Sequence, residues 1–432
     1  MSKTIGVGLI GLGTVGGGVV RLLQDAPASM RRRKGVDLAL RRVAVRDAAK
    51  AREVAVDAGL LTQDAMAVVR DPGVQMVVEL TGAPQAYEWI SEALQAGKDV
   101  VTANKALLAE RGDELFRLAL EKGADLMFEA SVAGGIPIIR ALRNGLVANR
   151  VESLYGILNG TTNYILTQMS RGAGGYVDTL RQAQEKGYAE PDPTFDVSGM
   201  DAAQKLAILC RIAFHTTGTA RQIFCEGIER IEPQDIEYAR ELGYTIKLLA
   251  IAKRRGEQVE ARVHPVMVPA ESLIANIHDV FNAIEVVGSS VGTQVFYGRG
   301  AGQMPTASAV VADMVELAER RSSGAGPAIG DMIIGDEGTT IADMRNVELR
   351  YYLRALACDR PGVLAQIARI LAEERISIAS VIQKERDLQG GTVPLIIVTH
   401  EASEAAMQRA LTALGRLDIL EGPAKVIRIE AP

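Results

Sequence analysis

TIGVGLIGLGTVG, residues Thr4 to Gly16, is the stretch of this sequence that decides the fold. The segment from Thr4 to Ile10 is mostly apolar and is typical of a buried strand. It runs directly into the G-x-G-x-x-G motif Gly11-Leu12-Gly13-Thr14-Val15-Gly16. Such glycines permit a tight turn and let backbone N–H groups at the start of a helix approach a pyrophosphate. The stretch predicts a dinucleotide-binding site, with an ordinary tight turn between strand and helix as the alternative.

Short β-branched runs alternate with helical patterns through residues 1–140. After the first strand, the strand-like runs are Leu38–Val45, Met76–Glu79, Asp99–Thr102 and Asp125–Phe128. This alternation predicts an α/β fold whose parallel sheet carries helices on both faces. We therefore expect a Rossmann-type, doubly wound dinucleotide-binding domain over residues 1–140.

Two opposite charges follow the second predicted strand, where such domains contact the ribose of the cofactor. Asp47 would accept a hydrogen bond from the 2′-hydroxyl of NAD, whereas Arg46 would pair with the 2′-phosphate of NADP. Lys50 and Arg52 add positive charge nearby, although surface charge on the following helix explains them nearly as well. The sequence predicts NADP or NAD, with NADP favoured.

Polar residues follow two later strands. Thr81 comes after Met76–Glu79, and Lys105 ends the segment VTANK after Asp99–Thr102. Ligands of doubly wound sheets lie beyond the carboxyl ends of the strands, so Thr81 and Lys105 fall on the side of the cofactor, and Lys105 falls where nicotinamide and substrate should meet. From position alone, an ordinary surface lysine is an equal alternative.

The segment from Phe128 to Pro137, FEASVAGGIP, places an acid, Glu129, before a turn of small residues with accessible carbonyls. Such carbonyls suit a hard monovalent cation or a tight hinge between domains. The residues alone favour the hinge.

An acidic loop, GYAEPDPTFDVSGMDAAQK, occupies residues 187–205. Its two prolines stiffen the chain and display Glu190 and Asp196. We expect a helix to begin at about Ser198 as N-cap, which places Asp201 and Lys205 one turn apart on one face. A capping acid and a lysine at the edge of the core are the alternative. Glu190 and Asp196 beside them favour a functional site.

The remaining chain predicts a substrate-handling domain and a smaller terminal domain. Residues 156–164, GILNGTTNY, are expected to form a turn that opens into a helix. The segments Glu260–Met267 and Ala283–Tyr297 look like strands. The glycine-rich residues 298–302, GRGAG, precede an expected helix at Ala307–Glu319. The Gly/Ser/Pro-rich stretch Ser322–Gly330 marks a domain boundary. From residue 348 the pattern is β-α-β-β-α-β.

Composition excludes several other classes of protein. A net charge of −5 and a pI near 5.7 leave no basic surface for nucleic acid. No apolar stretch reaches the roughly 18 residues of a membrane span, and the run Ile5–Ile10 is expected to be a strand, because it lacks the positively charged n-region and long h-region of a signal peptide. The three cysteines are widely spaced. We expect a cytoplasmic protein with reduced cysteines.

Together these motifs carry a family resemblance. The glycine loop, VTANK, FEASVAGGIP, GILNGTTNYI, GYAEPDPTFDVSGMDAAQKLAIL and YGRGAGQMPTASAV, in this order, resemble homoserine dehydrogenase, and the last 85 or so residues resemble a ferredoxin-like ACT domain, which binds amino acids. The resemblance implies reversible NAD(P)H-dependent reduction of L-aspartate 4-semialdehyde to L-homoserine, on the route to threonine, isoleucine and methionine. It divides the chain into a dinucleotide-binding domain at 1–140, an α+β substrate and dimerisation domain at 141–304, a helix at 305–321 that packs back on the first domain, a linker at 322–347 and an ACT domain at 348–432.

The resemblance also implies roles for individual residues. Lys205 matches the proton donor, with Asp201 beside it and Lys105 as a second essential lysine near the cofactor. Substrate contacts are expected from Glu190, Asp196, Asp201, Lys105, Gly160 and Thr161, and additional cofactor contacts from Gly187 and Gly302. Glu129 with the backbone carbonyls of Val132, Gly134 and Ile136 matches a site for Na⁺ or K⁺. Asp192 receives no catalytic role.

The family further implies a homodimer or homotetramer, with threonine as the expected effector of the ACT domain.

Two other functions compete with this one. Aspartate-semialdehyde dehydrogenase would need a nucleophilic cysteine after a strand near the cofactor, and no cysteine stands there. A non-enzymatic sensor would not need Lys105, Asp201 and Lys205 together with Glu190.

Overall fold

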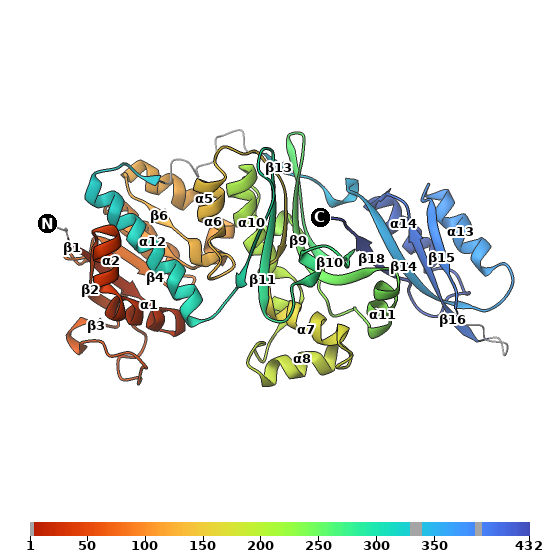
Figure 1. The fold of residues 1–432 in the computed structure, drawn as a ribbon, viewed down its shortest axis with the longest axis horizontal. Coiled ribbons are helices and arrows are strands. Elements are labelled where there is room, and N and C mark those ends of the chain that lie inside the picture. Colours follow the sequence, from red (N-terminus) through yellow and green to blue (C-terminus); the bar gives the residue numbers. More distant parts are fainter. Residues whose placement is uncertain (1–3, 329–338, 385–390) are drawn as a thin grey trace.

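The computed structural model describes residues 4–328, 339–384 and 391–432. Figure 1 shows three parts side by side along the longest axis of the molecule, with the N-terminal part at the left and the C-terminal part at the right. Lys105 begins helix α5 (Lys105–Lys122) of the N-terminal part, and Lys205 lies in helix α10 (Met200–Phe214) of the central part.

The N-terminal part is a six-stranded sheet of order β3-β2-β1-β4-β5-β6 in which every pair of neighbours is parallel. The strands are β1 (Thr4–Ile10), β2 (Asp37–Ala44), β3 (Leu61–Thr62), β4 (Met76–Glu79), β5 (Asp99–Thr102) and β6 (Leu126–Met127). The helices are α1 (Thr14–Asp25), α2 (Pro27–Lys34), α3 (Ala65–Arg70), α4 (Ala86–Gln95) and α5 (Lys105–Lys122). The predicted doubly wound parallel sheet is confirmed. The short strand β3 was not predicted, because two residues are too few to show a strand pattern.

Helix α12 (Gln303–Ser323) follows the central part in sequence but lies on the N-terminal sheet, as Figure 1 shows. It packs against α1 so closely that a Cβ on Gly18 would lie 2.8 Å from the Cβ of Ala307. Val310 and Met314 are fully buried in the same core cluster as Val7 of β1. The chain therefore crosses between the first two parts twice, once after β6 and once before α12.

The central part is built on a mixed sheet of order β12-β11-β7-β9-β10, which continues into the C-terminal part. Its strands are β7 (Val151–Ile157), β8 (Phe224–Cys225), β9 (Tyr244–Arg255), β10 (Gln258–Pro269), β11 (Phe281–Gly288) and β12 (Gly292–Arg299). Its helices are α6 (Ile138–Arg140), α7 (Gly160–Ser170), α8 (Tyr176–Glu185), α9 (Thr194–Val197), α10 (Met200–Phe214) and α11 (Pro233–Glu241). The predicted segment Ala283–Tyr297 is a hairpin of two strands, because a turn around Gly292 reverses the chain.

The C-terminal part confirms the β-α-β-β-α-β pattern. Its main elements are β14 (Glu348–Cys358), α13 (Val363–Glu373), β15 (Ile378–Ile382), β16 (Thr392–Thr399), α14 (Glu404–Leu414) and β18 (Lys425–Ile429). Strand β18 pairs in parallel with β10, so the C-terminal sheet extends the central one. Of the predicted linker, 322–347, residues 329–338 lie outside the described ranges, while β13 (Thr340–Ile341) pairs with β10.

Buried ion pairs add to this junction. Arg354 of β14 donates to Asp235 of α11 at 2.6 Å, and both side chains are almost inaccessible to solvent. Arg428 of β18 donates to Glu226 at 2.7 Å. The C-terminal part is thus attached to the central part by a strand pair, by the buried pair of Arg354 and Asp235, and by the ion pair of the buried Arg428 with the partly exposed Glu226.

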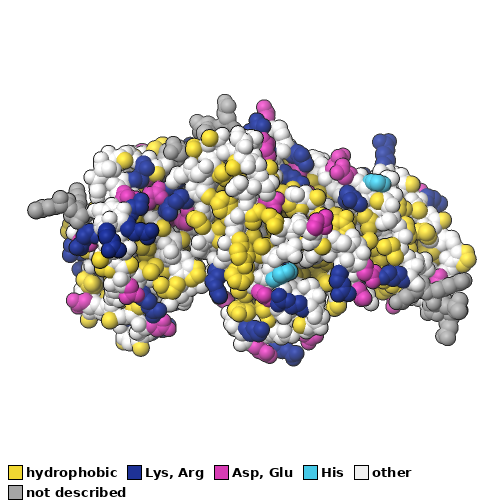
Figure 2. All heavy atoms as spheres, viewed as in Figure 1, with side chains coloured by type: hydrophobic (Ala, Val, Ile, Leu, Met, Phe, Trp, Pro, Cys, Tyr) yellow, Lys and Arg dark blue, Asp and Glu magenta, His cyan; other side chains and the backbone are white. Residues whose placement is uncertain are grey.

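The outer surface carries both signs of charge. On the face in Figure 2, basic side chains gather over the N-terminal part with acidic ones among them, and both signs recur over the rest. Among the helices that the structure describes, none is long and apolar enough to cross a membrane.

Candidate active site

The glycine motif forms a tight turn at the end of β1. Gly11 has φ +100°, and a Cβ there would lie 2.9 Å from the Cγ2 of Thr81. A Cβ on Gly16 would lie 2.1 Å from the carbonyl oxygen of Gly11, so this position also requires glycine. At Gly13, in contrast, a Cβ would have no atom of another described residue within 4 Å, its chain neighbours apart. Gly11 and Gly16 shape the turn, and Gly13 leaves its outer face open to a ligand at the N-terminus of α1.

A groove of about 1120 Å³ lies beyond the carboxyl ends of β1, β2 and β4. This volume exceeds the roughly 300–1,000 Å³ of sites for drug-sized ligands, as an extended dinucleotide requires. Its lining includes Gly11, Leu12, Gly13, Arg46, Asp47, Lys50, Arg52, Thr81, Pro84 and Trp89. The structure thus brings the glycine loop, the residues predicted to contact the ribose and Thr81 to one cavity.

The loop after β2 is held by its own hydrogen bonds. Asp47 Oδ1 accepts the N–H of Ala49 at 2.9 Å. The guanidinium of Arg52 donates to the carbonyls of Asp47 and of Lys50, the latter at 2.7 Å. Within the described ranges, Arg46 and Lys50 form no ion pair, and both are exposed. Arg52 therefore orders the loop, while Arg46 and Lys50 stay available to an anionic ligand.

Glu79, at the end of β4, is a buried residue of the site that the sequence analysis missed. Its Oε1 accepts both the N–H and the hydroxyl of Thr81 at 2.7 Å, and its Oε2 accepts the hydroxyl of Thr102 at 2.8 Å. Thr102 Oγ1 in turn accepts the N–H of Asn104, which caps the helix that Lys105 begins. One carboxylate thereby links the cofactor groove to the lysine. An acid ending the apolar run MVVE is the signal that pointed to it.

The two predicted lysines meet on one carboxylate. Asp201 Oδ2 lies 2.7 Å from Lys205 Nζ, and Asp201 Oδ1 lies 3.3 Å from Lys105 Nζ. Lys205 Nζ also donates to the carbonyl of Leu158 at 2.7 Å. Lys105 Nζ lies 5.8 Å from the ring centroid of Phe195. Helices α5 and α10, far apart in sequence, place two cations on opposite oxygens of one acid.

Burial and charge act against each other at Asp201, whose side chain is only 7% exposed. Burial opposes its ionisation, but the charges of Lys205 and Lys105 and the hydrogen bonds from Lys205 and Asn159 outweigh burial and hold the pKa of Asp201 below its ordinary value. Asp201 is therefore a carboxylate at neutral pH.

Asp196 joins the same network. Its Oδ1 accepts a hydrogen bond from Asn159 at 2.8 Å, and its Oδ2 lies 3.0 Å from the hydroxyl of Thr161. Asn159 also donates to Asp201 Oδ2 at 2.8 Å. Gly160 begins α7, where a Cβ would lie 2.8 Å from the carbonyl oxygen of Val280. The sequence analysis gave Asn159 no role; its place directly before Gly160, as the N-cap, was the available signal.

Other predicted residues lie at the edge of this cluster. Glu190 is exposed, and among the described residues its carboxylate forms no ion pair or hydrogen bond. Asp192 Oδ1 accepts the N–H of Thr194 at 3.1 Å, which gives this acid a structural task. Gly187 follows α8 with φ +72°, and Gly302 precedes α12 with φ +124°. Neither glycine lines the 1120 Å³ groove.

The helix begins within two residues of the expected position, but the expectation that Ser198 is its N-cap is wrong. A separate turn, α9, ends at Val197, and α10 begins at Met200 after Gly199, which has φ +87°. Only glycine adopts this left-handed conformation readily, and a Cβ there would lie 3.0 Å from the Sγ of Cys225. Ser198 has helical φ and ψ, so it cannot act as the N-cap of α10.

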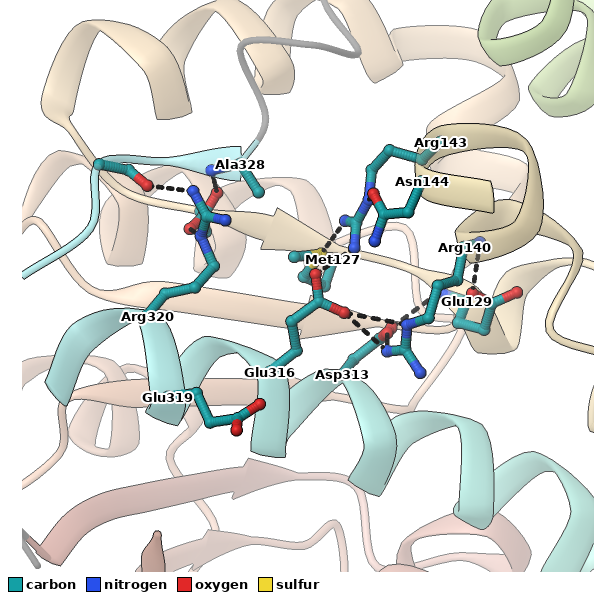
Figure 3. Close-up of polar contacts among 12 residues, drawn as sticks. Met127, Glu129, Arg140, Arg143, Asn144, Asp313, Glu316, Glu319, Arg320 and Ala328 are labelled. Carbon is teal, nitrogen blue, oxygen red and sulfur yellow. Dashed lines mark hydrogen bonds and ion pairs between the residues drawn. The ribbon is translucent and has the colours of Figure 1, made fainter. Parts of the chain in front are cut away.

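The loop around Glu129 lies at the first crossing between the domains, and Figure 3 shows its contacts with α12. Glu129 accepts the N–H groups of Ile139 and Arg140 at 2.9 and 2.8 Å, and its own N–H donates to Asp313 at 2.8 Å. Arg140 pairs with Asp313 and Glu316 of α12 at 3.2 and 2.9 Å. The two chain crossings are therefore tied together.

Burial raises the pKa of Glu129 despite its two backbone donors. Burial, followed by the nearby charge of Glu129, raises the pKa of Asp313 to about 8. The loop itself is tight: a Cβ on Gly134, which has φ +52°, would lie 2.5 Å from the carbonyl oxygen of Gly300, and the carbonyl of Ile136 accepts the N–H of Ile138 at 2.8 Å. The site has two buried acids that a further positive charge would stabilise.

Comparison with known proteins identifies the family. Family models for the homoserine dehydrogenase NAD-binding domain, for homoserine dehydrogenase and for the ACT domain match residues 11–129, 137–315 and 351–416. The homoserine dehydrogenase of Pseudomonas aeruginosa is 44% identical over 99% of this chain and 99% of its own length, and that of Neisseria gonorrhoeae is 42% identical over 99% of each. The crystal structure of a homoserine dehydrogenase from Thiobacillus denitrificans superposes with a TM-score of 0.93, at 45% identity over 100% of this chain and 99% of that one.

These matches cover all three parts of the molecule, and the match at the C-terminal part is the ACT domain. They exclude both the acyl-transfer enzyme and the non-enzymatic sensor considered above. The chain therefore belongs to the homoserine dehydrogenase family, and it is an oxidoreductase that uses a nicotinamide cofactor to interconvert L-aspartate 4-semialdehyde and L-homoserine.

Proposed function

We propose that Lys205 protonates the alkoxide that forms when L-aspartate 4-semialdehyde is reduced, and that Asp201 and Lys105 complete the catalytic group. The observation that carries this proposal is the single carboxylate of Asp201 at 2.7 and 3.3 Å from the two lysines. The reduced nicotinamide, when bound, supplies the hydride. An ammonium has three N–H groups, and Lys205 gives two of them to Asp201 and the carbonyl of Leu158. Within the described part of the chain the third has no acceptor, so it is available to the substrate oxygen.

In the direction of homoserine oxidation the same residues act in reverse. Lys205, once it has lost its proton, takes the proton from the substrate hydroxyl as the hydride leaves. Asp201 stabilises the ammonium that results, and Lys105 keeps Asp201 ionised throughout. Proton transfer therefore needs no further acid.

For the substrate, we assign Asp196 and Glu190 to the α-ammonium group, with Gly160 and Thr161 beside them. Asp196 accepts a hydrogen bond from Asn159 and lies 3.0 Å from the hydroxyl of Thr161, whose single proton is shared with the carbonyl of Tyr188 at 2.7 Å. Glu190, in contrast, is exposed and free to move onto a ligand. Asp196→Asn and Glu190→Gln should each raise the KM for L-homoserine by about tenfold or more, because each loses a charge-assisted hydrogen bond of about 1.5–3 kcal/mol. An unchanged KM in either variant would remove that residue from the substrate site.

For the cofactor, we propose a preference for NADP over NAD. Arg46 and Lys50 line the groove and form no ion pair among the described residues. Arg52 holds the loop through its hydrogen bonds to the carbonyls of Asp47 and Lys50. Asp47 already uses one oxygen within its own turn. We assign Thr81, Gly187 and Gly302 to further cofactor contacts, together with the motif from Gly11 to Gly16. A higher kcat/KM with NADH than with NADPH would contradict the preference.

We further propose a monovalent cation, Na⁺ or K⁺, bound by Glu129 and the backbone carbonyls of Val132, Gly134 and Ile136. Carboxylate and carbonyl oxygens are the ligands that hard cations take. A cation here would offset the burial that raises the pKa of Glu129. Its role would be to hold the crossing between the domains in place, and no chemical step depends on it.

Regulation and assembly complete the proposal. We propose that threonine binds the ACT domain, that the protein forms a homodimer or homotetramer in the cytoplasm, and that domains span 1–140, 141–304 and 348–432 with a linker at 322–347. The edge strand β12 exposes Val295 and Tyr297, and an exposed apolar edge favours pairing with a second copy. Flat activity across added threonine would contradict the first point, and a monomer in solution the second.

The catalytic proposal is tested by following NADPH oxidation and L-homoserine formation together. The wild-type enzyme should convert the two in equal amounts. Lys205→Ala should lower kcat far more than it weakens NADPH binding, since Lys205 lies outside the 1120 Å³ groove. Near-wild-type kcat in this variant would exclude Lys205 as the proton donor.

A further inference from the structure

Asn159 lies at the centre of the acid and lysine cluster and makes every hydrogen bond that its amide allows. Its Oδ1 accepts the N–H of Thr162 at 2.9 Å and lies 3.0 Å from the hydroxyl of Thr162. Its Nδ2 donates to Asp196 Oδ1 and to Asp201 Oδ2, both at 2.8 Å. The side chain is 6% exposed. An amide has two N–H donors, so none remains for a substrate or cofactor.

The two acids that Asn159 joins come from different elements. Asp196 lies in α9 and Asp201 in the first turn of α10, separated by the left-handed Gly199. Both carboxylates lie 2.8 Å from the same nitrogen, the Nδ2 of Asn159, and two negative charges this close repel each other. A neutral, planar amide between them reduces that repulsion and fixes the direction in which each carboxylate faces.

The remaining oxygens then have defined partners. With Oδ1 taken by Asn159, Asp196 presents Oδ2 toward Thr161. With Oδ2 shared by Asn159 and Lys205, Asp201 presents Oδ1 to Lys105. The position of one amide thus determines which oxygen each acid offers to its neighbours.

We propose that Asn159 is a positioning residue for the dehydrogenase reaction, acting through Asp196 on substrate binding and through Asp201 on proton transfer. The proposal rests on the roles assigned above to these two acids. Asn159 touches neither substrate nor cofactor. It holds the acid that binds the α-ammonium at a fixed position relative to the acid that carries both lysines, so that a bound substrate presents its C4 oxygen to Lys205.

The competing explanation is that Asn159 only caps α7, since its Oδ1 is the N-cap acceptor. Serine and aspartate cap helices about as well as asparagine. Asn159→Ser keeps the cap and removes both N–H donors to the acids. Asn159→Asp also keeps the cap and the shape, but it turns two donors into a third carboxylate. The two variants therefore separate capping from positioning.

We expect Asn159→Ser to lower kcat by about 10- to 100-fold, the usual loss when a residue that orients a functional group is removed. The KM for L-homoserine should rise about tenfold, and the KM for NADPH should stay within twofold. Asn159→Asp should be worse than Asn159→Ser in both constants, because a third negative charge faces the other two. Capping alone predicts equal behaviour of the two variants.

Asn163→Ser is the matched control on the same helix. Asn163 is also buried and donates to two acceptors, the carbonyls of Ile277 and Phe281 at 3.2 and 3.1 Å, but it contacts neither acid of the site. It should lower Tm by as much as Asn159→Ser and leave kcat within threefold of wild type.

Three results would overturn the proposal. The first is kcat and KM within twofold of wild type in both Asn159 variants. The second is equal loss in Asn159→Ser and Asn163→Ser. The third is failure of both Asn159 variants to fold, which would show that the hydrogen bonds of Asn159 to the two acids hold the fold together rather than position groups for the reaction. If Asp196→Asn and Asp201→Asn stay fully active, the roles assigned to these two acids are wrong. If those variants lose activity and Asn159→Ser keeps it, only the positioning role of Asn159 is refuted.

Discussion

Asp201→Asn is the substitution whose effect the structure constrains most directly. It removes the negative charge between two lysines while keeping the size of the side chain. Lys205 counts most, because its side chain is 13% exposed and its Nζ lies 2.7 Å from Asp201, whereas the Lys105 side chain is 34% exposed and its Nζ lies at 3.3 Å. Removing one partner of a buried ion pair costs about 3–5 kcal/mol, and exposed pairs contribute about 1 kcal/mol or less.

Not all of this loss falls on the transition state, since the folded ground state also loses the pair. We take about 3–4 kcal/mol as the part expressed in catalysis, which corresponds to a fall in kcat of roughly 100- to 1,000-fold at 1.36 kcal/mol per factor of ten. The side-chain amide that Asp201→Asn introduces would also place an NH₂ group where Asp201 has an oxygen. At Oδ2 this NH₂ would face the N–H donors of Lys205 and Asn159, with which it cannot form a hydrogen bond.

The assay is steady-state NADPH oxidation with L-aspartate 4-semialdehyde, accompanied by the Kd for NADPH and by Tm. Asp192→Asn is the control, because Asp192 lies in the same loop and its carboxylate, among the described residues, has a hydrogen bond with Thr194 and none with the lysines. It should behave as wild type. A folded Asp201→Asn enzyme with kcat within threefold of wild type would refute the view that one carboxylate serves both lysines.

Three further predictions concern stability and cofactor choice. Without Na⁺ or K⁺ at the Glu129 loop, the pKa of Asp313 is raised to about 8, so Asp313 is protonated in the fold at neutral pH, whereas in the unfolded chain it ionises at about pH 3.9. Stability is then lost as pH rises from about 4 to 8, and Asp313→Asn, measured without these cations, should flatten the unfolding free energy over about pH 5–8 by up to about 1.4 kcal/mol per pH unit; an unchanged slope would argue against this origin. Arg354→Met should lower the free energy of unfolding in urea by about 3–5 kcal/mol, because it leaves the buried Asp235 without its cation, and a loss below 1 kcal/mol would contradict this. Arg46→Ala should raise the KM for NADPH about tenfold with little change for NADH, whereas equal effects on both cofactors would show that Arg46 does not contact the 2′-phosphate.

The N-terminal domain could be predicted because its signals are local. A strand that runs into G-x-G-x-x-G specifies its own turn through Gly11 and Gly16, and most of the parallel strands, such as β1 and β4, are short apolar runs between helices. The i, i+4 contact between Asp201 and Lys205 could be predicted for the same reason, since helix geometry alone brings them together.

What depended on distant parts of the chain could not be predicted. The pairing of β18 with β10 joins residues far apart in sequence, and no pattern in either strand names its partner. The Lys105 contact with Asp201 requires the first two domains to be packed together. Ser198 was taken as a cap because its type suits that role, but the path of the chain beside Cys225 requires the left-handed turn at Gly199 instead.

Glu79 and Asn159 show a second limit. Neither is recognised by a spacing rule, because each acts on groups from separate elements: Glu79 on Thr81 and Thr102, Asn159 on Asp196 and Asp201. A strand end or an N-cap position can draw attention to such residues, but the groups that they join are known only once both partners have been placed in space.

The central claim is that Asp201 and Lys205 act as one catalytic unit, and a double-mutant cycle tests it most directly. Residues that act as a unit give losses that do not add. We predict that Asp201→Asn combined with Lys205→Ala lowers kcat no further than the more damaging of the two single substitutions. A double variant whose loss equals the product of the two single losses would contradict the claim.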